Sequence, residues 1–246
     1  MTNPVHIARK SPARLVLEGL HSVKHAHRFG AEFHGLWSDR PAEVLALARQ
    51  LAPDLLPLLE TRLEAVSEAV FAGFCPRPPE TRLVAVADTP AYHLEKIGRG
   101  PVVLLDRPRH PGNLGAVIRV AAAADATAVC CLEGIDPWSA ASLRGAAGLH
   151  FALPVLTVSE PPDLDRPLLA LDDRGEPLGA APLPENAVYA FGSERDGLSP
   201  ALRAAATRSV AIPMRKGVSS LNLATAVAVL LYALERSTGQ ATLPPT

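Results

Sequence analysis

Short apolar segments alternate with helix-like segments over the second half of the chain, and this alternation restricts the fold more than any other feature. The runs at 101–106 (PVVLLD) and 127–132 (TAVCCL) are almost wholly apolar, and the Ala-rich segment 116–125 lies between them. Such strands, joined by helices, are typical of a parallel sheet that is covered on both faces. Further apolar runs are LPVLTV (153–158), PLLALDD (167–173), AVYAFG (187–192) and SVAIPM (209–214), with helices predicted over 139–148 and from about 222 to 235. We therefore predict an α/β fold with a parallel sheet.

The composition is that of a globular chain with a sizeable core. Of the 246 residues, 48% are hydrophobic and 20% are charged, while aromatic residues make up 4%, so Ala, Leu and Val must fill the core. The formal net charge is -1. Any contact with RNA would therefore have to come from local basic patches.

Several features predict a cytoplasmic protein. Two of the three cysteines, Cys130 and Cys131, are adjacent in an apolar run, which suits core positions in a reducing cytosol better than a disulfide framework. The N-terminal residues lack an apolar signal core. The longest apolar segment, 223–234, is too short to span a bilayer, so we expect no association with membranes.

A second, smaller α/β unit is predicted over the first ninety residues or so. Gly30 is placed to end one of its helices and Ser67 to cap another. The expected strands are 14–17, 32–39 and 81–88, and the expected helices are 21–30, 41–52 and 66–74. Charged residues from Glu60 to Glu68 indicate an ordinary exposed surface.

These patterns divide the chain into two domains. Residues 1–92 form the first domain, in which 1–13 is expected to be a loose arm because it is polar and contains two prolines. The segment 93–100 belongs to a stretch interrupted by Pro and Gly and is interpreted as a linker. Residues 101–238 form the second domain, and 239–246 is expected to be a frayed tail.

The predicted helix 21–30 is rich in histidine and basic residues, namely His21, Lys24, His25, His27 and Arg28. A weak RNA-facing patch and a plain solvated face explain this helix equally well. His21 and His25, four residues apart, could hold a metal ion, but no companion carboxylate or cysteine pattern supports that reading. We therefore predict no metal site.

Polar loops follow three of the predicted strands, and in open parallel sheets ligands bind outside the carboxyl ends of strands. In the first loop, 108–119, Gly112 and Gly115 allow close backbone approach. Asn113 can donate, accept or cap the following helix, and Arg119 brings a charge suited to phosphate. A capped helix with an exposed arginine would explain this loop equally well.

The other two loops are ambiguous when each is taken alone. The segment 191–199 (FGSERDGLS) has glycines at both ends of a polar turn, and such turns are often only turns. Ser219, Ser220 and Asn222 stand at the start of the last helix, where they form an ordinary capping arrangement. A helix start beside a loop also offers free backbone groups that can hold a small polar ligand.

Taken together, the three loops closely resemble the SpoU (TrmH-type) branch of the SPOUT RNA methyltransferases. The resemblance covers about residues 101–235, and the motifs agree in order and spacing. The matching residues are Asn113, Gly115 and Arg119 in the first motif, Gly192, Glu194, Gly197 and Leu198 in the second, and Ile212-Pro213-Met214 with Ser220-Leu221-Asn222 in the third.

The resemblance implies a fold, an activity and partners. The fold would be a parallel sheet with a trefoil knot, an exception to the rule that chains do not knot. The first domain resembles the small ribosomal-protein-like RNA-binding domain that often precedes this catalytic domain. The activity would be transfer of a methyl group from S-adenosylmethionine to a ribose 2′-hydroxyl of structured RNA, ribosomal RNA being favoured over transfer RNA, by an obligate homodimer.

The resemblance also assigns roles to individual residues. The cofactor would be held around Gly192, Gly197, Ile212, Met214 and Leu221. The chemistry would involve Arg119, Asn113, Glu194, Ser220 and Asn222. Arg119 would activate the target hydroxyl or position an adjacent phosphate. Because arginine is normally always protonated, stabilising the developing alkoxide is the simpler role.

Two positions depart from the family pattern, and two other functions compete. Arg195 followed by Asp196 replaces the Gly that usually follows the second-motif glutamate, and Ala146 replaces a common serine. One alternative is an RNA-binding protein without turnover, which the retained catalytic set argues against. The other is a nucleotide-binding oxidoreductase, but no Gly-x-Gly-x-x-Gly follows the first strand of either unit.

Overall fold

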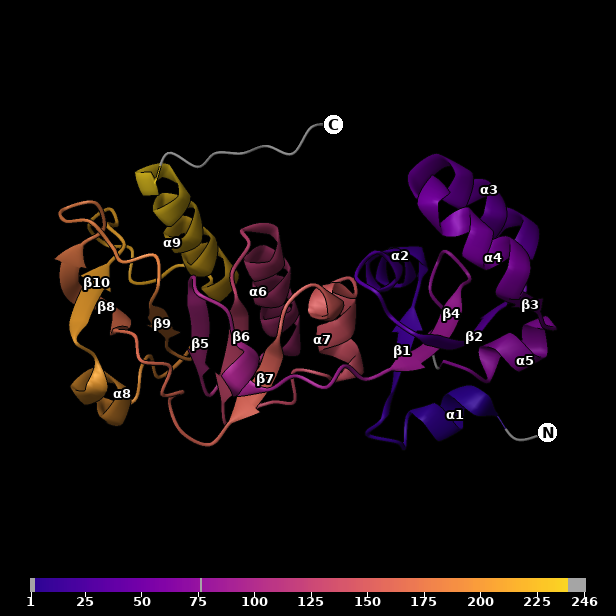
Figure 1. The fold of residues 1–246 in the computed structure, drawn as a ribbon, viewed down its shortest axis with the longest axis horizontal. Coiled ribbons are helices and arrows are strands. Elements are labelled where there is room, and N and C mark those ends of the chain that lie inside the picture. The colour runs from indigo at the N-terminus through magenta and orange to yellow at the C-terminus, as the bar shows by residue number, and fades with distance from the viewer. Residues whose placement is uncertain (1–2, 76, 239–246) are drawn as a thin grey trace. The chain divides into compact units, whose positions relative to one another are not determined.

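The computed structural model describes residues 3–75 and 77–238, and the chain forms two compact units (Figure 1). The first unit comprises Met1–Ala91 and Ala146–Ala152, and the second comprises Tyr92–Gly145 and Leu153–Thr246. The division after Ala91 lies beside the predicted boundary at residue 92, but Ala146–Ala152 were expected in the second domain. The predicted tail, 239–246, lies outside the described residues.

The first unit is built on a small sheet. Its strands are β1 (Arg14–Glu18), β2 (Phe33–Ser38), β3 (Leu63–Ala65) and β4 (Val84–Asp88). They lie in the order β1-β4-β2-β3, with β4 antiparallel to both neighbours and β3 parallel to β2. Its helices are α1 (Pro4–Ala8), α2 (Leu20–Arg28), α3 (Pro41–Leu51), α4 (Leu56–Arg62) and α5 (Glu68–Ala72), with a 3-10 turn, η1 (Pro53–Leu55).

The three strands and three helices predicted for this region are confirmed, and so are two helix ends. The Ser67 hydroxyl accepts a hydrogen bond from the N–H of Val70 at 3.3 Å and so caps α5. Gly30, with φ 79°, follows the end of α2 and donates its N–H to the carbonyl of His27.

The prediction of a loose arm is wrong for residues 4–8, which form α1. The side chain of Asn3 caps this helix, and Val5 and Ala8 are 0% and 3% exposed in a core cluster that includes Phe71. Only these two inward-facing residues mark the helix, so the sequence shows no periodicity over so short a segment. The sequence analysis also missed α4, which overlaps the start of the stretch from Glu60 to Glu68 interpreted as an exposed charged surface, and β3, which lies within that stretch.

The segment Ala146–Ala152 packs in the first unit, beside α2. It contains a 3-10 turn, η3 (Leu149–Phe151), that contacts α2. The ring Nδ1 of His25 lies 2.8 Å from the carbonyl oxygen of Ala147, and burial lowers the pKa of His25. The ring of His25 therefore packs within this unit, against the segment that contains Ala147. In the described part of the chain, no group of three or more His, Cys, Asp or Glu side chains is arranged as a metal site.

The second unit contains a parallel sheet, as predicted. Its strands are β5 (Val102–Asp106), β6 (Ala128–Leu132), β7 (Val155–Val158), β8 (Leu168–Pro177), β9 (Val188–Phe191) and β10 (Arg208–Ala211). They lie in the order β10-β8-β9-β5-β6-β7, and every neighbouring pair is parallel. The helices are α6 (Pro111–Ala123), α7 (Ala140–Gly145), α8 (Pro200–Ala205) and α9 (Leu223–Thr238), with a 3-10 turn, η2 (Leu94–Lys96).

The burial of β5 shows that this sheet is covered on both faces. Successive side chains of a strand point to opposite faces, and all five residues of β5 are buried. Cys130 and Cys131 on the neighbouring β6 are also fully buried and free of disulfides. Burial raises the pKa of the Cys130 thiol to about 12, so the interpretation of these cysteines as core residues is confirmed.

The strand order reverses between the neighbouring strands β5 and β9. From β5 the chain continues to β6 and β7 on one side, and then returns to build β8, β9 and β10 on the other side. The segment after β5 leads into α6, and the segment after β9 is the polar turn 192–199. Ligands bind where the strand order reverses in this way. The topology therefore makes the edge of the sheet at the carboxyl ends of β5 and β9 the expected place for a ligand site.

An interruption of β8 shapes the same edge. The pairing with β10 jumps between two neighbouring residues, because Ser209 is opposite Ala170 but Val210 is opposite Glu176. Residues 171–175 of β8 therefore leave the regular ladder. A Cβ at Gly175 would lie 2.5 Å from the backbone nitrogen of Val210. Only glycine lets the two strands approach each other so closely there.

Two helices of this unit differ from the prediction. α6 begins at Pro111, so Asn113 and Gly115 lie inside the helix rather than in a loop, and Asn113 does not cap it. Proline is common in the first turn of a helix, because its fixed φ is helical and because backbone N–H groups in that turn have no partner within the helix. The short helix α8 was not predicted. None of the helices in the described residues has the length and hydropathy of a membrane span.

Candidate active site

The three predicted motifs meet through side-chain hydrogen bonds. The side-chain amide nitrogen of Asn113, on α6, donates to Glu194 Oε1 at 2.8 Å. The amide nitrogen of Asn222, at the start of α9, donates to Asn113 Oδ1 at 3.1 Å. We call these three residues the Asn–Glu–Asn network. These residues lie as far as 109 positions apart in the chain. The fold therefore brings one residue of each motif into contact.

Asn222 has a second task, which explains why the network stands at a helix start. Its Oδ1 accepts the N–H groups of Ala224 at 2.9 Å and Thr225 at 3.4 Å. This is the N-cap arrangement predicted for α9. The side-chain oxygen of Asn222 therefore caps α9, while its side-chain nitrogen donates a hydrogen bond to Asn113 on α6.

The turn that carries Glu194 is closed by its own backbone. Ser193 and Gly197 exchange two hydrogen bonds, each 3.1 Å long. A Cβ at Gly192 would lie 2.1 Å from the carbonyl carbon of Gly197 and 2.2 Å from the nitrogen of Leu198. The turn therefore requires glycine at position 192 for its own closure, whatever else that residue contacts.

Two ion-pair or hydrogen-bond contacts fix this turn to the rest of the unit. Asp196 pairs with Arg109, which lies between β5 and α6. The buried carboxylate of Asp106, at the end of β5, accepts the N–H of Ser199 at 2.5 Å. Asp196, one of the departures from the family pattern, thus connects the second motif to the segment that leads into the first.

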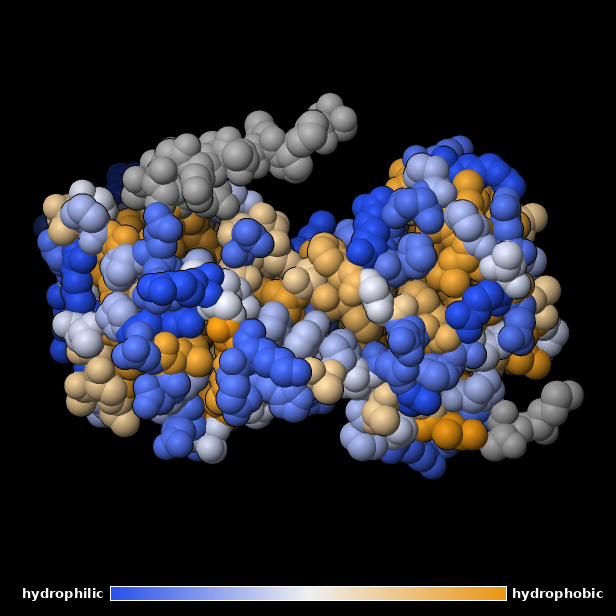
Figure 2. Space-filling view, in the orientation of Figure 1, coloured by the Kyte–Doolittle hydropathy of each residue, from blue (hydrophilic) through white to orange (hydrophobic). Residues whose placement is uncertain are grey.

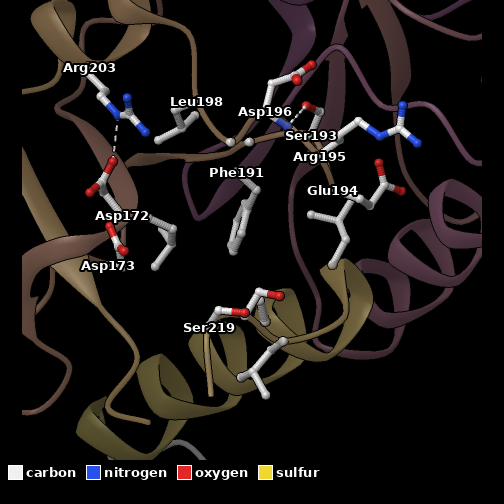
Figure 3. Close-up of a pocket in the computed structure, with 17 residues that line it drawn as sticks. Asp172, Asp173, Phe191, Ser193, Glu194, Arg195, Asp196, Leu198, Arg203 and Ser219 are labelled. Atoms are coloured by element: carbon white, nitrogen blue, oxygen red, sulfur yellow. Dashed lines mark hydrogen bonds and ion pairs between the residues drawn. The ribbon is translucent and has the colours of Figure 1, made fainter. Parts of the chain in front are cut away.

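Two cavities with shared lining residues lie beside the turn, and Figure 3 shows the larger of them. The larger has a volume of about 530 Å³ and is lined by segments 171–173, 191–198 and 219–221 with Arg203, Leu223 and Ala226. The smaller has a volume of about 170 Å³ and has apolar residues Val210, Ile212 and Met214 in its lining. The two share the wall Leu171, Asp172, Asp173, Ser219, Ser220, Leu221 and Ala226. Together they suit an elongated ligand with one apolar and one charged end.

The charged side chains of the larger cavity separate into two groups. Figure 3 shows Asp172 and Arg203 on one side and Glu194 and Arg195 on the other. Arg203 Nε donates to Asp172 Oδ2 at 2.6 Å. Burial by itself would raise the pKa of Asp172, but the backbone N–H of Arg174 and the guanidinium of Arg203 outweigh it, so that pKa is lowered. Asp172 is therefore a charged member of the wall.

The structure distributes the predicted site residues over three places. Glu194, Gly192, Gly197, Ser220 and Leu221 line the larger cavity, and Ile212 and Met214 line the smaller one with Ser220 and Leu221. Asn113 and Asn222 stand behind Glu194 in the network.

Arg119 is the exception. It lies on an exposed part of α6, six residues beyond Asn113, which corresponds to about 9 Å along the axis and a different face of the helix. No hydrogen bond or ion pair of its side chain is present among the described residues. Arg119 therefore shares a sequence motif with Asn113 but does not take part in the hydrogen bonds of the Asn–Glu–Asn network.

The sequence analysis did not identify several cavity residues. Asp172 and Asp173 were assigned to the end of a strand, Ser219 was assigned only to the start of the last helix, and Phe191 and Arg203 were given no role. A signal existed for the two aspartates, because an acidic pair at the carboxyl end of an apolar parallel strand stands where ligands bind. Arg203 lies on α8, a helix that the sequence pattern did not show.

Comparison with known proteins agrees with this geometry. The SpoU rRNA methylase family profile matches residues 100–232, more than half of the chain. The 23S rRNA (uridine(2479)-2′-O)-methyltransferase of Streptomyces viridochromogenes is 31% identical over 91% of this chain and 83% of its own length. The 23S rRNA (guanosine(2553)-2′-O)-methyltransferase RlmP of Bacillus subtilis is 31% identical over 72% of this chain and 74% of its own length.

A solved structure agrees over nearly the whole chain. The SpoU methyltransferase AviRb from Streptomyces viridochromogenes, in complex with the cofactor AdoMet, has a TM-score of 0.77 and 26% identity, covering 94% of this chain and 93% of its own. The likeness extends beyond the matched family region, since it includes the first unit. On the profile match and these two relatives, the chain belongs to the SpoU rRNA methylase family.

Proposed function

We propose that this protein transfers a methyl group from S-adenosylmethionine to a ribose 2′-hydroxyl of structured RNA, with ribosomal RNA the favoured substrate. The observation that carries the proposal is the Asn–Glu–Asn network, which joins the three family motifs beside two adjacent cavities. Both curated relatives described above are named as 23S rRNA 2′-O-methyltransferases, which supports the choice of ribosomal RNA.

The chemistry of the cavity linings fits this cofactor. Ile212, Met214 and Leu221 offer an apolar surface of the kind that an adenine ring requires. The larger cavity offers Glu194, Ser220 and the backbone of the turn 192–198 to the charged amino-acid half. When bound, the cofactor supplies an electrophilic methyl group on its sulfonium.

Within this scheme the network positions Glu194. The Asn113 amide holds one carboxylate oxygen of Glu194, and Asn222 in turn holds Asn113. Because charge-assisted hydrogen bonds are stronger and more directional than neutral ones, this arrangement orients the carboxylate at the cavity wall. Ser220 lines the same wall and can donate or accept through its hydroxyl.

Arg119 serves the RNA rather than the cofactor in this proposal. Its exposed guanidinium can grip the phosphate next to the target ribose and stabilise the alkoxide that develops on the 2′-oxygen. A ribose hydroxyl is a weak nucleophile near neutral pH, so close alignment with the methyl donor supplies much of the rate.

The experiment uses labelled S-adenosylmethionine, total RNA and the variant Arg119→Ala. We expect methyl transfer to fall by roughly 100-fold or more, while calorimetric cofactor affinity stays within about twofold because Arg119 lines neither cavity. The matched control is Arg99→Ala, which removes an exposed arginine of the same unit that lines none of the described cavities.

Equal rates for Arg119→Ala and the natural protein would overturn the role of this residue. If the natural protein bound the cofactor but methylated no RNA, the competing interpretation of an RNA-binding protein without turnover would be supported instead. Mapping the labelled 2′-O-methyl group would then identify the RNA and the nucleotide.

We also propose that the first unit binds RNA, but with a smaller basic surface than the sequence indicates. Arg28 makes two hydrogen bonds to Asp54, at 2.7 and 2.8 Å, and His25 is turned toward Ala147. Of the basic residues on α2, only His21 and Arg28 are exposed. Affinity that falls steeply with added salt would show that local cations still dominate RNA binding.

The family pattern further suggests a homodimer, a trefoil knot formed by the segment from β10 through α9, and a cytoplasmic location. Leu221, Val229 and Tyr232 are 39%, 37% and 45% exposed. Val229 and Tyr232 are three residues apart and therefore neighbours on one face of α9. Such exposed apolar residues support a subunit contact there, and light scattering of Tyr232→Glu would test it, since a dimer that persists unchanged would exclude this face.

A further inference from the structure

The interruption of β8 carries one acidic side chain to the wall that both cavities share. Residues 171–175 leave the ladder between β8 and β10, and Asp173 lies in the middle of them. It contributes to the lining of the larger and of the smaller cavity. Figure 3 shows it beside Asp172, at the same side of the larger cavity. Bulges are common beside active sites, where they redirect a side chain.

Asp173 differs from the other acidic residues of the larger cavity in having no basic or amide side chain as a partner among the described residues. The other three each have one: Arg203 donates to Asp172, Asn113 donates to Glu194, and Arg109 pairs with Asp196. Within the described residues no basic side chain pairs with Asp173, whose side chain interacts with its neighbour Asp172. No basic side chain in the described residues therefore offsets this carboxyl group at the cavity wall.

The two ends of the cofactor differ in charge in a way that matches this wall. The adenosyl half is neutral and fits the smaller cavity with Ile212 and Met214. The other half carries a sulfonium and an ammonium against a single carboxylate, so S-adenosylmethionine has a net charge of about +1 at neutral pH, from the ordinary pKa values of its groups. Loss of the methyl group removes the sulfonium charge, and S-adenosylhomocysteine is neutral overall.

We propose that Asp173 is the counter-charge for the cationic half of the cofactor, and that it makes the site prefer S-adenosylmethionine over its demethylated product. This inference rests on the proposed function and names a residue of the same site that the family motifs do not include. A carboxylate near the sulfonium attracts the positively charged S-adenosylmethionine, but it does not attract S-adenosylhomocysteine in this way, because that product is neutral overall. Product release is thereby favoured after each transfer.

The expected size of the effect is modest, because Asp173 is exposed. A partly solvated pair of opposite charges changes affinity by about fivefold. Asp173→Asn removes the charge and keeps the size of the side chain. We therefore expect it to weaken binding of S-adenosylmethionine by about fivefold and binding of the two neutral ligands below by less than about twofold.

The test measures dissociation constants by calorimetry for three ligands. They are S-adenosylmethionine, S-adenosylhomocysteine and 5′-methylthioadenosine, which keeps the nucleoside but lacks the amino-acid portion and the positive charge. The matched control is Glu185→Gln, which removes one exposed negative charge of the same unit outside the described cavities. Asp173→Glu should restore most of the preference, since it restores the charge.

Each outcome separates the possibilities. Selective weakening of S-adenosylmethionine in Asp173→Asn, with no change in Glu185→Gln, supports the proposal. Equal weakening of all three ligands overturns it, because Asp173 would then contact the nucleoside. Unchanged affinities also overturn it. If the natural protein binds none of the three, the proposed function itself fails, and circular dichroism of each variant excludes misfolding as the cause of a loss.

Discussion

Replacing Gly192 by alanine is the sharpest test of how the site is built. The new Cβ would lie 2.1 Å from the carbonyl carbon of Gly197 and 2.2 Å from the nitrogen of Leu198. Carbon atoms in contact are normally about 3.5–4.0 Å apart, so the backbone at 197–198 would have to move by more than about 1 Å. The atoms in the way are backbone atoms, which cannot swing aside as the end of a long side chain can.

Such overpacking of a fitted site costs about 3 kcal/mol, at the upper end of the usual range. For a chain of this size we expect the melting temperature to fall by roughly 6–12 °C. The displaced turn would also break the paired hydrogen bonds between Ser193 and Gly197 and move Glu194 away from Asn113. Affinity for S-adenosylmethionine should therefore fall by about tenfold or more, since a fall of 1.4 kcal/mol in binding energy is already tenfold.

Thermal unfolding followed by circular dichroism measures the first effect, and calorimetry with S-adenosylmethionine measures the second. Gly112→Ala is the matched control. A Cβ at Gly112 meets no atom within 4 Å, and Gly112 lies in the first turn of α6, where alanine is tolerated or stabilises by up to about 1 kcal/mol. A melting temperature of Gly192→Ala within about 2 °C of the natural protein would refute the reasoning.

Two further changes test the network and the cavity wall. Asn222→Asp keeps the oxygen that caps α9 but loses the N–H donor to Asn113, so we expect near-natural thermal stability with methyl transfer reduced by about tenfold or more. Asn222→Ala should lose both the capping oxygen and the donor, and should therefore lower the free energy of unfolding by about 1 kcal/mol as well. Equal stability of the two variants would contradict the capping role. The lowered pKa of Asp172 means that its ion pair with Arg203 stabilises the fold above the unfolded pKa, about 3.9, and that this contribution is lost as the pH falls through the lower folded pKa. In urea unfolding, the stability difference between the natural protein and Asp172→Asn should thus stay constant from about pH 8 to 5 and shrink below about pH 4, and a difference that grows on acidification would contradict this sign.

The sequence predicted the local backbone features of the candidate site, because their signals lie at single positions. Asn222 stands where an apolar helix begins, and the structure confirms it as the cap of α9. The glycines around Glu194 indicated a tight turn, and the turn is present. These features follow from backbone chemistry at single positions, which one sequence displays directly.

What the sequence could not show depends on which distant segments lie together. The departure of Asp172 and Asp173 from the β8 ladder is set by how β10 pairs with β8, and no period in the run PLLALDD reveals that pairing. Likewise, Arg119 and Asn113 share a motif, yet the rotation of α6 between them places them on different faces. Asp196 departed from the family pattern, and only the structure supplies its partner, Arg109.

The path of the chain between the two units has a practical consequence for dissecting this protein. The chain passes from one unit to the other three times, after Ala91, after Gly145 and after Ala152. A fragment that starts at residue 92 would carry Ala146–Ala152 without the helix α2 on which they pack, and would expose His150 and Phe151, which are 0% and 9% exposed in the full chain. A single cut therefore does not yield two independent modules. Swapping the first unit for that of a relative would require exchanging this seven-residue segment as well.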